Sequence, residues 1–306
     1  MQRQSFDLLI LGSSSAAPTT KRNPSAQLLN VAERFFLIDC GEATQIQLRR
    51  YKARFQKIDH IFISHLHGDH FLGLPGFLAS MHLLGRKQEL NIYCPKELKN
   101  IIELLNTVSE TRMNYEIKWH FTKDDGLNLL FEDDKTEVYS FPMKHRIFCT
   151  GFLVKEKPLL RKIDKDKLDK NKISTAEVNK LRHGEDVINE EGKKIKNKEV
   201  TIDPEPPRSF AYCSDTVYDE DLVKYVKGVD LLYHESTFLN DKAKRAAETF
   251  HSTAEQAAKI AKAAKVKQLV IGHYSARYGD LEPFINEASP FFKNVLLASE
   301  GKKIKI

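Results

Sequence analysis

The stretch Ser64-His65-Leu66-His67-Gly68-Asp69-His70 directly follows the apolar, strand-like run from Ile58 to Ile63. It places three imidazoles and one carboxylate within six residues. Alternation along the strand sends the first two histidines to the same side, and the turn at the glycine brings the aspartate and the third histidine alongside. Imidazoles and carboxylates are ligands of hydrolytic zinc, and four of them would crowd one tetrahedral ion that also needs a water. The stretch therefore predicts a site for two metal ions at one rim of a sheet.

The overall composition is that of an ordinary globular protein. The chain has 306 residues, of which 41% are hydrophobic and 29% are charged, and its net charge is +6. It has no apolar run near the roughly 18 residues that a membrane helix needs, and its N-terminus leads directly into a strand at Phe6–Leu11. We therefore expect a cytoplasmic protein that makes no membrane contact. The positive charge mildly favours a polyanionic partner.

The cysteines indicate the same compartment. They form no CxxC pair, and each lies in or beside an apolar segment, at Cys40, Cys94, Cys149 and Cys213. We expect small buried residues with free thiols, which fit a reducing environment.

Apolar patterns predict two similar halves, each a layer of strands flanked by helices. In the first half we expect helices at Phe71–Leu84 and Pro95–Val108 and strands at Phe6–Leu11, Ala26–Val31, Arg34–Asp39, Ile58–Ile63, Leu90–Cys94, Tyr115–Phe121, Leu127–Phe131 and Thr136–Phe141. In the second half we expect helices at Asp219–Lys227, Thr253–Ala264 and Leu281–Ala288 and strands at Ser209–Cys213, Asp230–Tyr233, Gln268–Ile271 and Val295–Leu297. Two such halves predict an α/β protein built as a single four-layer αββα sandwich over residues 1–306.

One segment, residues 155–208, fits neither half. It carries 15 Lys and Arg against 12 Asp and Glu, has few large apolar residues and ends in a proline-rich exit. It can add little to a core. Two interpretations stay open here: a solvated or partly disordered insertion, or a flexible arm that touches a large substrate.

Four more polar residues lie at or just past the end of an apolar strand. They are His145, Asp215, His234 and His273. A lone histidine is more often structural, but recurrence of this placement in both halves favours one shared site. The other candidates lack the placement and are expected to be structural or solvent-facing, namely His60, His82, His120 and His183.

Taken together, these motifs resemble the metallo-β-lactamase superfamily and, within it, the ribonuclease Z family of tRNA 3′-processing endonucleases. The resemblance covers nearly the whole chain. The residues that carry it are, in order, Pro18-Thr19-Thr20-Lys21-Arg22-Asn23, Asp39-Cys40-Gly41-Glu42, the HxHxDH cluster, His145, Ser214-Asp215-Thr216, His234-Glu235-Ser236-Thr237, His251-Ser252-Thr253 and His273-Tyr274-Ser275-Ala276-Arg277-Tyr278. Lactamases, glyoxalases and phosphodiesterases share the cluster, whereas the HST triplet and the final motif are more specific.

The resemblance implies two zinc ions per chain. One would be bound by His65, His67 and His145, the other by Asp69, His70 and His273, with Asp215 bridging both. Two zinc ions sharing a water supply hydroxide for in-line attack on a phosphodiester. Asp39, outside this set, is expected to orient a ligand through a hydrogen bond.

The resemblance also implies catalytic and substrate-binding residues. Asp69 could hold a proton of the nucleophile, and Glu235 with His251 would deliver a proton to the leaving 3′-oxygen. In the alternative interpretation, His251 only caps the helix that begins near Thr253. Lys21, Arg22 and Arg277 are candidate phosphate contacts, with surface solvation as the alternative.

The implied function is zinc-dependent removal of the 3′ trailer of precursor tRNA, leaving a 3′-hydroxyl on the tRNA. By the same resemblance, segment 155–208 would be an exosite arm that grips the tRNA across a homodimer. Family arms often carry a Gly-Pro pair where this chain has Thr175-Ala176, which leaves the conformation of the arm's tip open.

Two other functions compete with this one. A zinc phosphodiesterase for small diesters would use the same metals but would need no arm. A catalytically silent RNA-binding relative would keep the fold without the ions, which the complete set of seven predicted ligands argues against.

Overall fold

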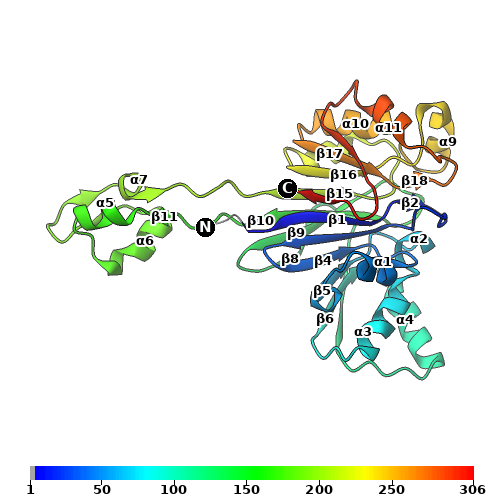
Figure 1. Cartoon of the computed structure of the whole chain (residues 1–306), viewed down its shortest axis with the longest axis horizontal. Coiled ribbons are helices and arrows are strands. Elements are labelled where there is room, and N and C mark those ends of the chain that lie inside the picture. Colours follow the sequence, from blue (N-terminus) through cyan, green and yellow to red (C-terminus); the bar gives the residue numbers. More distant parts are fainter. Residues whose placement is uncertain (1–3) are drawn as a thin grey trace. The chain divides into compact units, whose positions relative to one another are not determined.

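The computed structural model describes residues 4–306, which form two compact units. The larger unit, called the core unit here, comprises the chain up to Lys155 together with Arg208–Ile306. The smaller unit, called the arm unit, is Glu156–Pro207. Figure 1 shows the core unit as two sheets with helices outside them, which is the predicted four-layer αββα sandwich.

Each sheet of the core unit has seven strands. The first runs in the order β20 (Lys303–Lys305), β1 (Phe6–Gly12), β3 (Ala26–Val31), β4 (Arg34–Ile38), β5 (Ile58–Phe62), β6 (Leu90–Cys94) and β7 (Ile117–Phe121). The second runs β19 (Val295–Leu297), β17 (Gln268–Gly272), β16 (Leu231–Glu235), β15 (Ser209–Cys213), β10 (Thr150–Glu156), β9 (Thr136–Pro142) and β8 (Asn128–Glu132). A short parallel pair, β2 (Ser14–Ser15) and β18 (Tyr274–Ser275), joins two loops.

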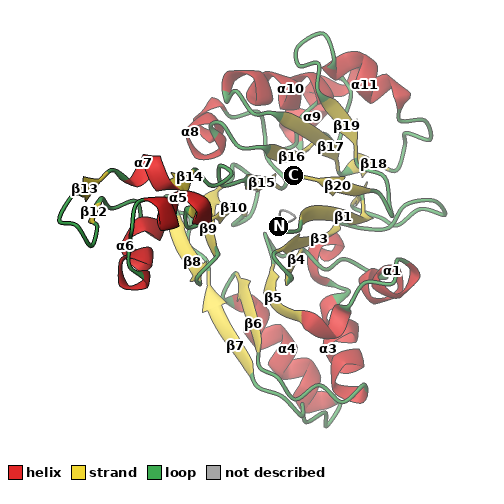
Figure 2. Ribbon diagram, turned by 60° about the vertical axis from the view of Figure 1, so that its left-hand side comes forward, coloured by secondary structure: helices red, strands yellow, loops and turns green. Residues whose placement is uncertain are grey.

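Helices cover the outer faces of both sheets, as Figure 2 shows. The first sheet is covered by α1 (Thr44–Arg50), α3 (Leu74–Leu83) and α4 (Glu97–Val108), and the second by α8 (Val223–Val226), α10 (Ala254–Ala263) and α11 (Glu282–Ala288). Two short helices, α2 (Gly68–Phe71) and α9 (Ala243–Glu248), lie in loops. None of the helices described within residues 4–306 is long and apolar enough to cross a membrane.

Alternation along the strands explains why the layers form. On β1, Leu8 and Ile10 belong to the buried cluster that includes Phe152 of the second sheet. Their neighbour Leu11 belongs instead to the cluster that includes Leu78 of α3. Burying each large apolar side chain stabilises the fold by roughly 1.5–3 kcal/mol. A strand that is apolar on both faces therefore has to lie between another sheet and a helical layer.

Most predicted elements of the core unit lie close to their expected bounds, with a few differences. The sequence did not predict β10, β20 or α9, and the helix expected at Asp219–Lys227 is a 3-10 turn at Glu220–Leu222 followed by α8. Four residues of β10, Phe152–Lys155, pair antiparallel with β15 across the charged segment, so this partner is distant in sequence. A strand of three residues, like β20, carries too short a pattern to be recognised.

The arm unit is ordered and has a small core of its own. It contains β11 (Lys162–Ile163), α5 (Lys165–Lys170), α6 (Val178–Arg182), β12 (Val187–Ile188), β13 (Lys194–Ile195), α7 (Asn197–Val200) and β14 (Thr201–Ile202). Its buried apolar residues are Ile173, Leu181, Val187, Ile195 and Val200. The interpretation of the segment as partly disordered does not match this structure, because these few residues are spaced so that they meet in one cluster.

Candidate metal centre and active-site cleft

Loops at one rim of the sandwich carry the side chains that the sequence singled out. They follow β4, β5, β9, β15 and β17 and bring together Asp39, the stretch Ser64–His70, His145, Asp215 and His273. β4 and β5 are parallel, and so are β15, β16 and β17. The carboxyl ends of parallel strands meet at one edge, where α/β folds place their ligand sites.

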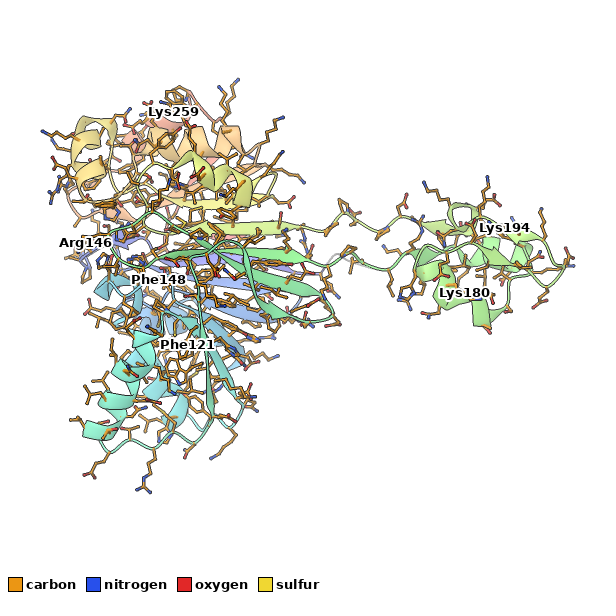
Figure 3. All side chains as sticks on the ribbon, turned by 180° about the vertical axis from the view of Figure 1, so that it is seen from behind. Phe121, Arg146, Phe148, Lys180, Lys194 and Lys259 are labelled. Atoms are coloured by element: carbon orange, nitrogen blue, oxygen red, sulfur yellow. The ribbon has the colours of Figure 1, made fainter. Side chains whose placement is uncertain are left out.

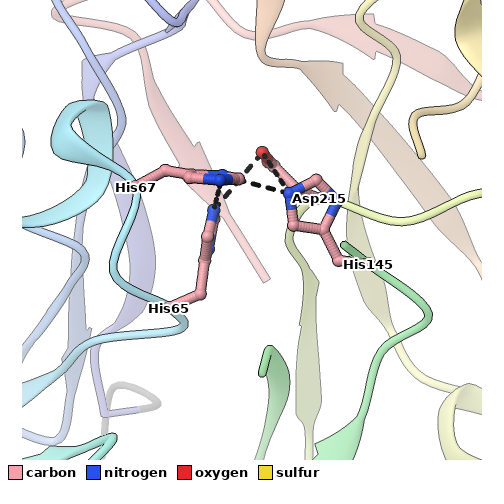
Figure 4. Close-up of side chains that lie close together, drawn as sticks. All are labelled: His65, His67, His145 and Asp215. Carbon is pink, nitrogen blue, oxygen red and sulfur yellow. Dashed lines mark hydrogen bonds and ion pairs between the residues drawn. The ribbon is translucent and has the colours of Figure 1, made fainter. Parts of the chain in front are cut away.

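Four of these side chains form a first donor group, drawn in Figure 4: His65, His67, His145 and Asp215. Nδ1 of His67 lies 3.1 Å from Nε2 of His65 and 3.1 Å from Nε2 of His145. Oδ2 of Asp215 lies 3.5 Å from Nε2 of His65. All four donor atoms lie within 4.8 Å of one another, which suits a single metal ion at their centre.

The second donor group consists of Asp69, His70 and His273. Nε2 of His273 lies 3.2 Å from Nε2 of His70 and 3.3 Å from Oδ2 of Asp69. Oδ1 of Asp215 lies 3.3 Å from the same His273 nitrogen, so Asp215 directs one oxygen to each group. A third set, Asp215 with His251 and His273, overlaps these two.

The chemistry of these donors fits metal ions. Asp215 is 2% exposed, and its Oδ1 accepts no hydrogen bond from the residues that the structure describes. A buried carboxylate oxygen without a hydrogen-bond donor is costly, and a cation beside it would offset that cost. The groups contain imidazole and carboxylate ligands without thiolate, which is typical of hydrolytic metal sites.

The protonation states fit as well. Burial alone would raise the pKa of Asp215 and of Asp69, but neighbouring histidines outweigh it and lower both values. Burial lowers the pKa of His65 to about 4 and also lowers that of His145. Burial alone would lower the pKa of His70, but the nearby carboxylates outweigh it and raise the pKa, so this imidazole holds a proton without metal. A bound cation would take the place of that proton. Ionised carboxylates and neutral imidazoles are the forms that bind metal.

Partners outside the donor groups orient the imidazoles. Nδ1 of His70 donates to Oδ2 of Asp39 at 2.7 Å, and Nδ1 of His273 donates to Oγ1 of Thr237 at 2.8 Å. Nδ1 of His145 donates to the backbone oxygen of Phe250 at 3.0 Å. Each of these bonds fixes the ring so that Nε2 faces the donor groups.

Asp39 lies beside the donor groups and belongs to neither of them. It is fully buried, and its backbone has a left-handed φ of 56°, which turns the carboxylate back under the rim. Besides the contact with His70, it accepts hydrogen bonds from Ser64 N at 2.8 Å, Ser64 Oγ at 3.0 Å and Tyr212 OH at 2.7 Å. These donors hold it in one orientation.

The fully buried Glu235 and the partly exposed His251 form a pair beside the donor groups. Nδ1 of His251 lies 3.0 Å from Oε1 of Glu235 and 3.9 Å from Oδ2 of Asp215. Burial alone would lower the pKa of His251, but Glu235 and Asp215 outweigh it and raise the pKa to about 9. The imidazole is therefore charged near neutral pH.

The alternative role for His251, as a helix cap, is wrong. Thr253 is the N-cap of α10 and forms a capping box with Gln256. The neighbouring Ser252 does not cap this helix, since its Oγ donates to the backbone oxygen of Thr216 at 2.8 Å.

His234 does not join the site, although it lies at a strand end. Its side chain is buried, and Nδ1 donates to the backbone oxygen of Glu235 at 2.6 Å. The structural interpretation also fits His60, which packs against Tyr93 and Phe131.

The three predicted phosphate contacts lie in different settings. Lys21 and Arg277 are exposed. Arg22 is 9% exposed, and its Nη2 donates to the backbone oxygen of Tyr278 at 2.7 Å. Arg22 therefore ties the loop that carries Lys21 to the loop that carries Arg277, and this placement does not suit a direct phosphate contact.

Two clefts open over the site. The metal-side cleft, of about 630 Å³, is lined by Ser15, Ala16, Glu42, His67, Gly68, Asp69, Leu72, His145, Arg146, Asp215, Arg245, Glu248, Thr249 and His251. The distal cleft, of about 240 Å³, is lined by Ser15, Ala16, Ala17, Thr237, Phe238, Arg245, Thr249, His251, Ser275, Ala276 and Arg277. The sequence analysis missed Arg146 and Arg245. The position of Arg146 directly after His145 was a usable signal, whereas nothing local to Arg245 connects it with the site.

Comparison with known proteins agrees with this geometry. A family model described as a beta-lactamase superfamily domain matches residues 166–274, and one described as anti-Pycsar protein Apyc1 matches residues 6–125. The chain is similar to proteins named ribonuclease Z, at 48% identity in Cytophaga hutchinsonii, covering 98% of this chain and 96% of that one. In Parabacteroides distasonis the identity is 42%, and the coverage is 98% and 99%.

Solved structures agree too. The crystal structure of human tRNase Z, short form, matches with a TM-score of 0.71 and 28% identity, over 98% of this chain and 99% of that one. YhfI from Bacillus subtilis, described as a metallo-beta-lactamase fold protein, matches with a TM-score of 0.70 at 17% identity and so supports the fold alone.

The sandwich and its histidine-aspartate rim define a metal site of the metallo-β-lactamase type. At 41–48% identity over nearly the full length of its relatives, the chain belongs to the ribonuclease Z family.

Replacing Asp39 should weaken metal binding. Asp39→Ala is expected to lower metal affinity about 10-fold to 100-fold, because the ring of His70 loses the acceptor that orients it. Metal retained after dialysis against graded chelator measures this. Tyr212→Phe is the matched control, since it removes one donor to the same carboxylate and keeps its contact with His70. Full metal retention by folded Asp39→Ala protein would contradict the assignment.

Proposed function

We propose that the protein is a zinc-dependent endoribonuclease that removes the 3′ trailer of precursor tRNA by phosphodiester hydrolysis and leaves a 3′-hydroxyl on the tRNA. The observation that carries this is the Glu235–His251 pair, 3.0 Å apart, beside a cluster of metal-binding side chains. Hydrolysis of a diester needs an activated water and a proton for the leaving oxygen, and this site offers groups for both. Membership of the ribonuclease Z family supports an RNA substrate.

In this proposal two zinc ions bind per chain. His65, His67 and His145 would hold one, and Asp69, His70 and His273 the other, with Asp215 giving one oxygen to each. The presence of two donor groups that share Asp215 supports this count. When bound, such ions lower the pKa of a shared water toward about 7 and neutralise charge on the phosphate.

His251 is the proposed proton donor to the leaving 3′-oxygen. Glu235 is fully buried and accepts hydrogen bonds from Thr237 N, Thr237 Oγ1 and Ser252 N as well as from His251. With its own position held so firmly, Glu235 keeps the imidazole charged and aimed into both clefts, which His251 lines. A positioned acid of this kind accelerates proton transfer by roughly 10²–10⁴-fold.

Asp69 is the proposed holder of the nucleophile's proton. Its Oδ2 accepts from the backbone N–H of Ala16 at 2.7 Å, so the small-residue loop after β1 fixes the carboxylate at the floor of the metal-side cleft. Lys21 and Arg277, which are both exposed, remain the proposed phosphate contacts.

The arm unit is the proposed exosite for tRNA, used across a homodimer in the cytoplasm. Its exposed basic side chains support this: Lys180 and Lys194, labelled in Figure 3, are 54% and 72% exposed on the surface of the unit. The four cysteines are free and buried, which suits the reducing cytoplasm. A phosphodiesterase for small diesters would have no use for such a unit.

Purified protein should cut a 3′-extended precursor tRNA once, at the end of the acceptor stem. Mapping both new ends should give a 3′-hydroxyl on the tRNA and a 5′-phosphate on the trailer.

Chelation should abolish cleavage, and metal analysis should give two ions per chain. Asp215→Ala should lose both ions and all activity, since one substitution removes a ligand from each. Active protein with one ion or none would refute the two-metal proposal.

The leaving-group acid can be tested without disturbing the metals. His251→Ala should slow the chemical step by roughly 10²–10⁴-fold while metal content and tRNA affinity stay close to normal. A substrate with a much better leaving group needs no acid and should restore most of the rate. Loss of metal in step with activity would show instead that His251 supports the metal site.

Removing the arm unit should separate binding from chemistry. Lys155 on β10 faces Ser209 on β15, so residues 157–206 can be replaced by a short Gly/Ser turn that closes the hairpin. Hydrolysis of an aryl phosphodiester should persist, whereas tRNA affinity should fall and become less dependent on salt. Lys162→Gln, Lys165→Gln and Lys167→Gln in the full chain test the charge alone. Unchanged tRNA affinity and salt dependence after the deletion would rule out an exosite.

A further inference from the structure

The metal-side cleft and the distal cleft adjoin each other. They share five lining residues, namely Ser15, Ala16, Arg245, Thr249 and His251. A strand of RNA lying in them would pass the donor groups first and His251 second. The proposed acid therefore stands at the boundary between the two clefts.

Three arginines line this path, and their surroundings differ. Arg146 lines only the metal-side cleft, where its Nη2 lies 3.2 Å from Nε2 of His67. Arg277 lines only the distal cleft, where its Nε donates to Oγ of Ser275 at 3.0 Å. Arg245 of α9 lines both clefts and so lies at the same boundary as His251.

The guanidinium of Arg245 is available to a ligand. Its ion pair with Glu248 measures 3.8 Å between Nη1 and Oε2, and the two side chains are 57% and 51% exposed. Exposed pairs of this kind contribute little in water. A phosphate would compete well for the guanidinium, because it can accept two parallel charge-assisted hydrogen bonds.

Backbone bonds hold Arg245 and His251 at a fixed separation. The backbone oxygen of Arg245 accepts from Thr249 N at 3.0 Å, and that of Ala246 accepts from His251 N at 2.8 Å. Between them Phe250 takes a left-handed φ of 58°, which ends the helix and turns the chain toward Glu235. The cation and the proposed acid are thus parts of one short, rigid segment.

The direction of the RNA follows from the chemistry. His251 protonates the leaving 3′-oxygen, so the ribose that carries this oxygen has to lie beside His251. The scissile phosphate lies on the metal side, and the chain continues from the same ribose through its 5′-oxygen to the next phosphate. That phosphate comes to the boundary with the distal cleft, where Arg245 lies.

We propose that Arg245 binds the phosphate on the 5′ side of the last nucleotide of the mature tRNA, the nucleotide whose 3′-oxygen is released. This assignment rests on the proposed function. It makes Arg245 a phosphate-binding residue that places the leaving group beside its acid. Glu248 competes with the phosphate for the same guanidinium and so weakens this contact.

A neutral linkage in the substrate tests the assignment. Single-turnover kcat/KM is measured on unmodified precursor tRNA and on precursor with one methylphosphonate at that 5′-side linkage. On unmodified RNA, Arg245→Gln should lose about 10-fold to 100-fold, the usual worth of a hydrogen-bonded charge, and Arg245→Lys should lose less. The methylphosphonate should lower kcat/KM of the wild type by a similar factor. On that substrate Arg245→Gln and the wild type should have almost the same kcat/KM, because the charge that Arg245 would contact is already gone.

The controls separate the possible failures. Lys244→Gln removes a neighbouring exposed charge on α9 that lines neither cleft, and it should behave as wild type on both substrates. Glu248→Gln should raise kcat/KM on unmodified RNA by a few fold. An Arg245→Gln defect that persists on the methylphosphonate substrate, or that disappears only when the neutral linkage lies on the 3′ side of the cut, would overturn the assignment. Wild-type protein unable to cut unmodified precursor would instead overturn the proposed function.

Discussion

The buried carboxylate of Asp215 is the constraint on which the rest of the structure depends. One of its oxygens lies 3.3 Å from His273 and the other 3.5 Å from His65, and these histidines come from different sheets. A carboxylate held this far from water needs positive charge close by, which the neighbouring imidazoles or a metal ion can supply. The strand ends of the two sheets must therefore stay in register, so that His65 from one sheet and His273 from the other both remain next to Asp215. The apolar layer between the sheets, with Phe62 against Phe152, provides that rigidity.

Several carboxylates are buried at this rim, and three of them are stabilised in different ways. Asp215 faces the donor groups, Asp39 is held by hydroxyl and amide donors while it orients His70, and Glu235 accepts several hydrogen bonds while it keeps His251 charged. Placing such groups side by side is costly unless each has its own donors. The donors around each carboxylate differ in the same way: Glu235 and Asp39 accept several hydrogen bonds from the protein and orient or polarise a neighbouring imidazole, whereas Oδ1 of Asp215 accepts none and faces the second donor group. The same logic assigns Arg22, whose guanidinium is used on a backbone carbonyl, to joining loops, and leaves Arg245 available to a substrate.

Sequence reasoning reached furthest where a local pattern carries the chemistry. The donor-rich stretch after β5 and the polar residues after later strands predicted the rim, because strand ends of one sheet converge. It failed where a role depends on which partner a side chain meets in the folded chain. His234 has the same placement as Asp215, yet its side chain is buried against its own strand's backbone. Likewise Ser252 and Thr253 are adjacent candidate caps, and only the position of Thr216 decides that Ser252 faces away from the helix. In the arm unit, five scattered apolar residues gave no periodic signal, and only folding brings Leu181 and Val200 into one cluster.

The sequence by itself determined the sandwich, the rim that carries the metal donors, and the residue types available for hydrolysis. Period-two patterns apolar on both faces require sheets covered on both sides, and histidine-aspartate clusters at strand ends have few other uses. The tertiary structure alone decided that His70 is the imidazole that Asp39 contacts, that Thr237 contacts His273, and that two clefts meet at His251 and Arg245. These depend on distances of a few ångströms between residues up to two hundred positions apart. Such distances arise from the packing of whole layers, which no local pattern of residues encodes.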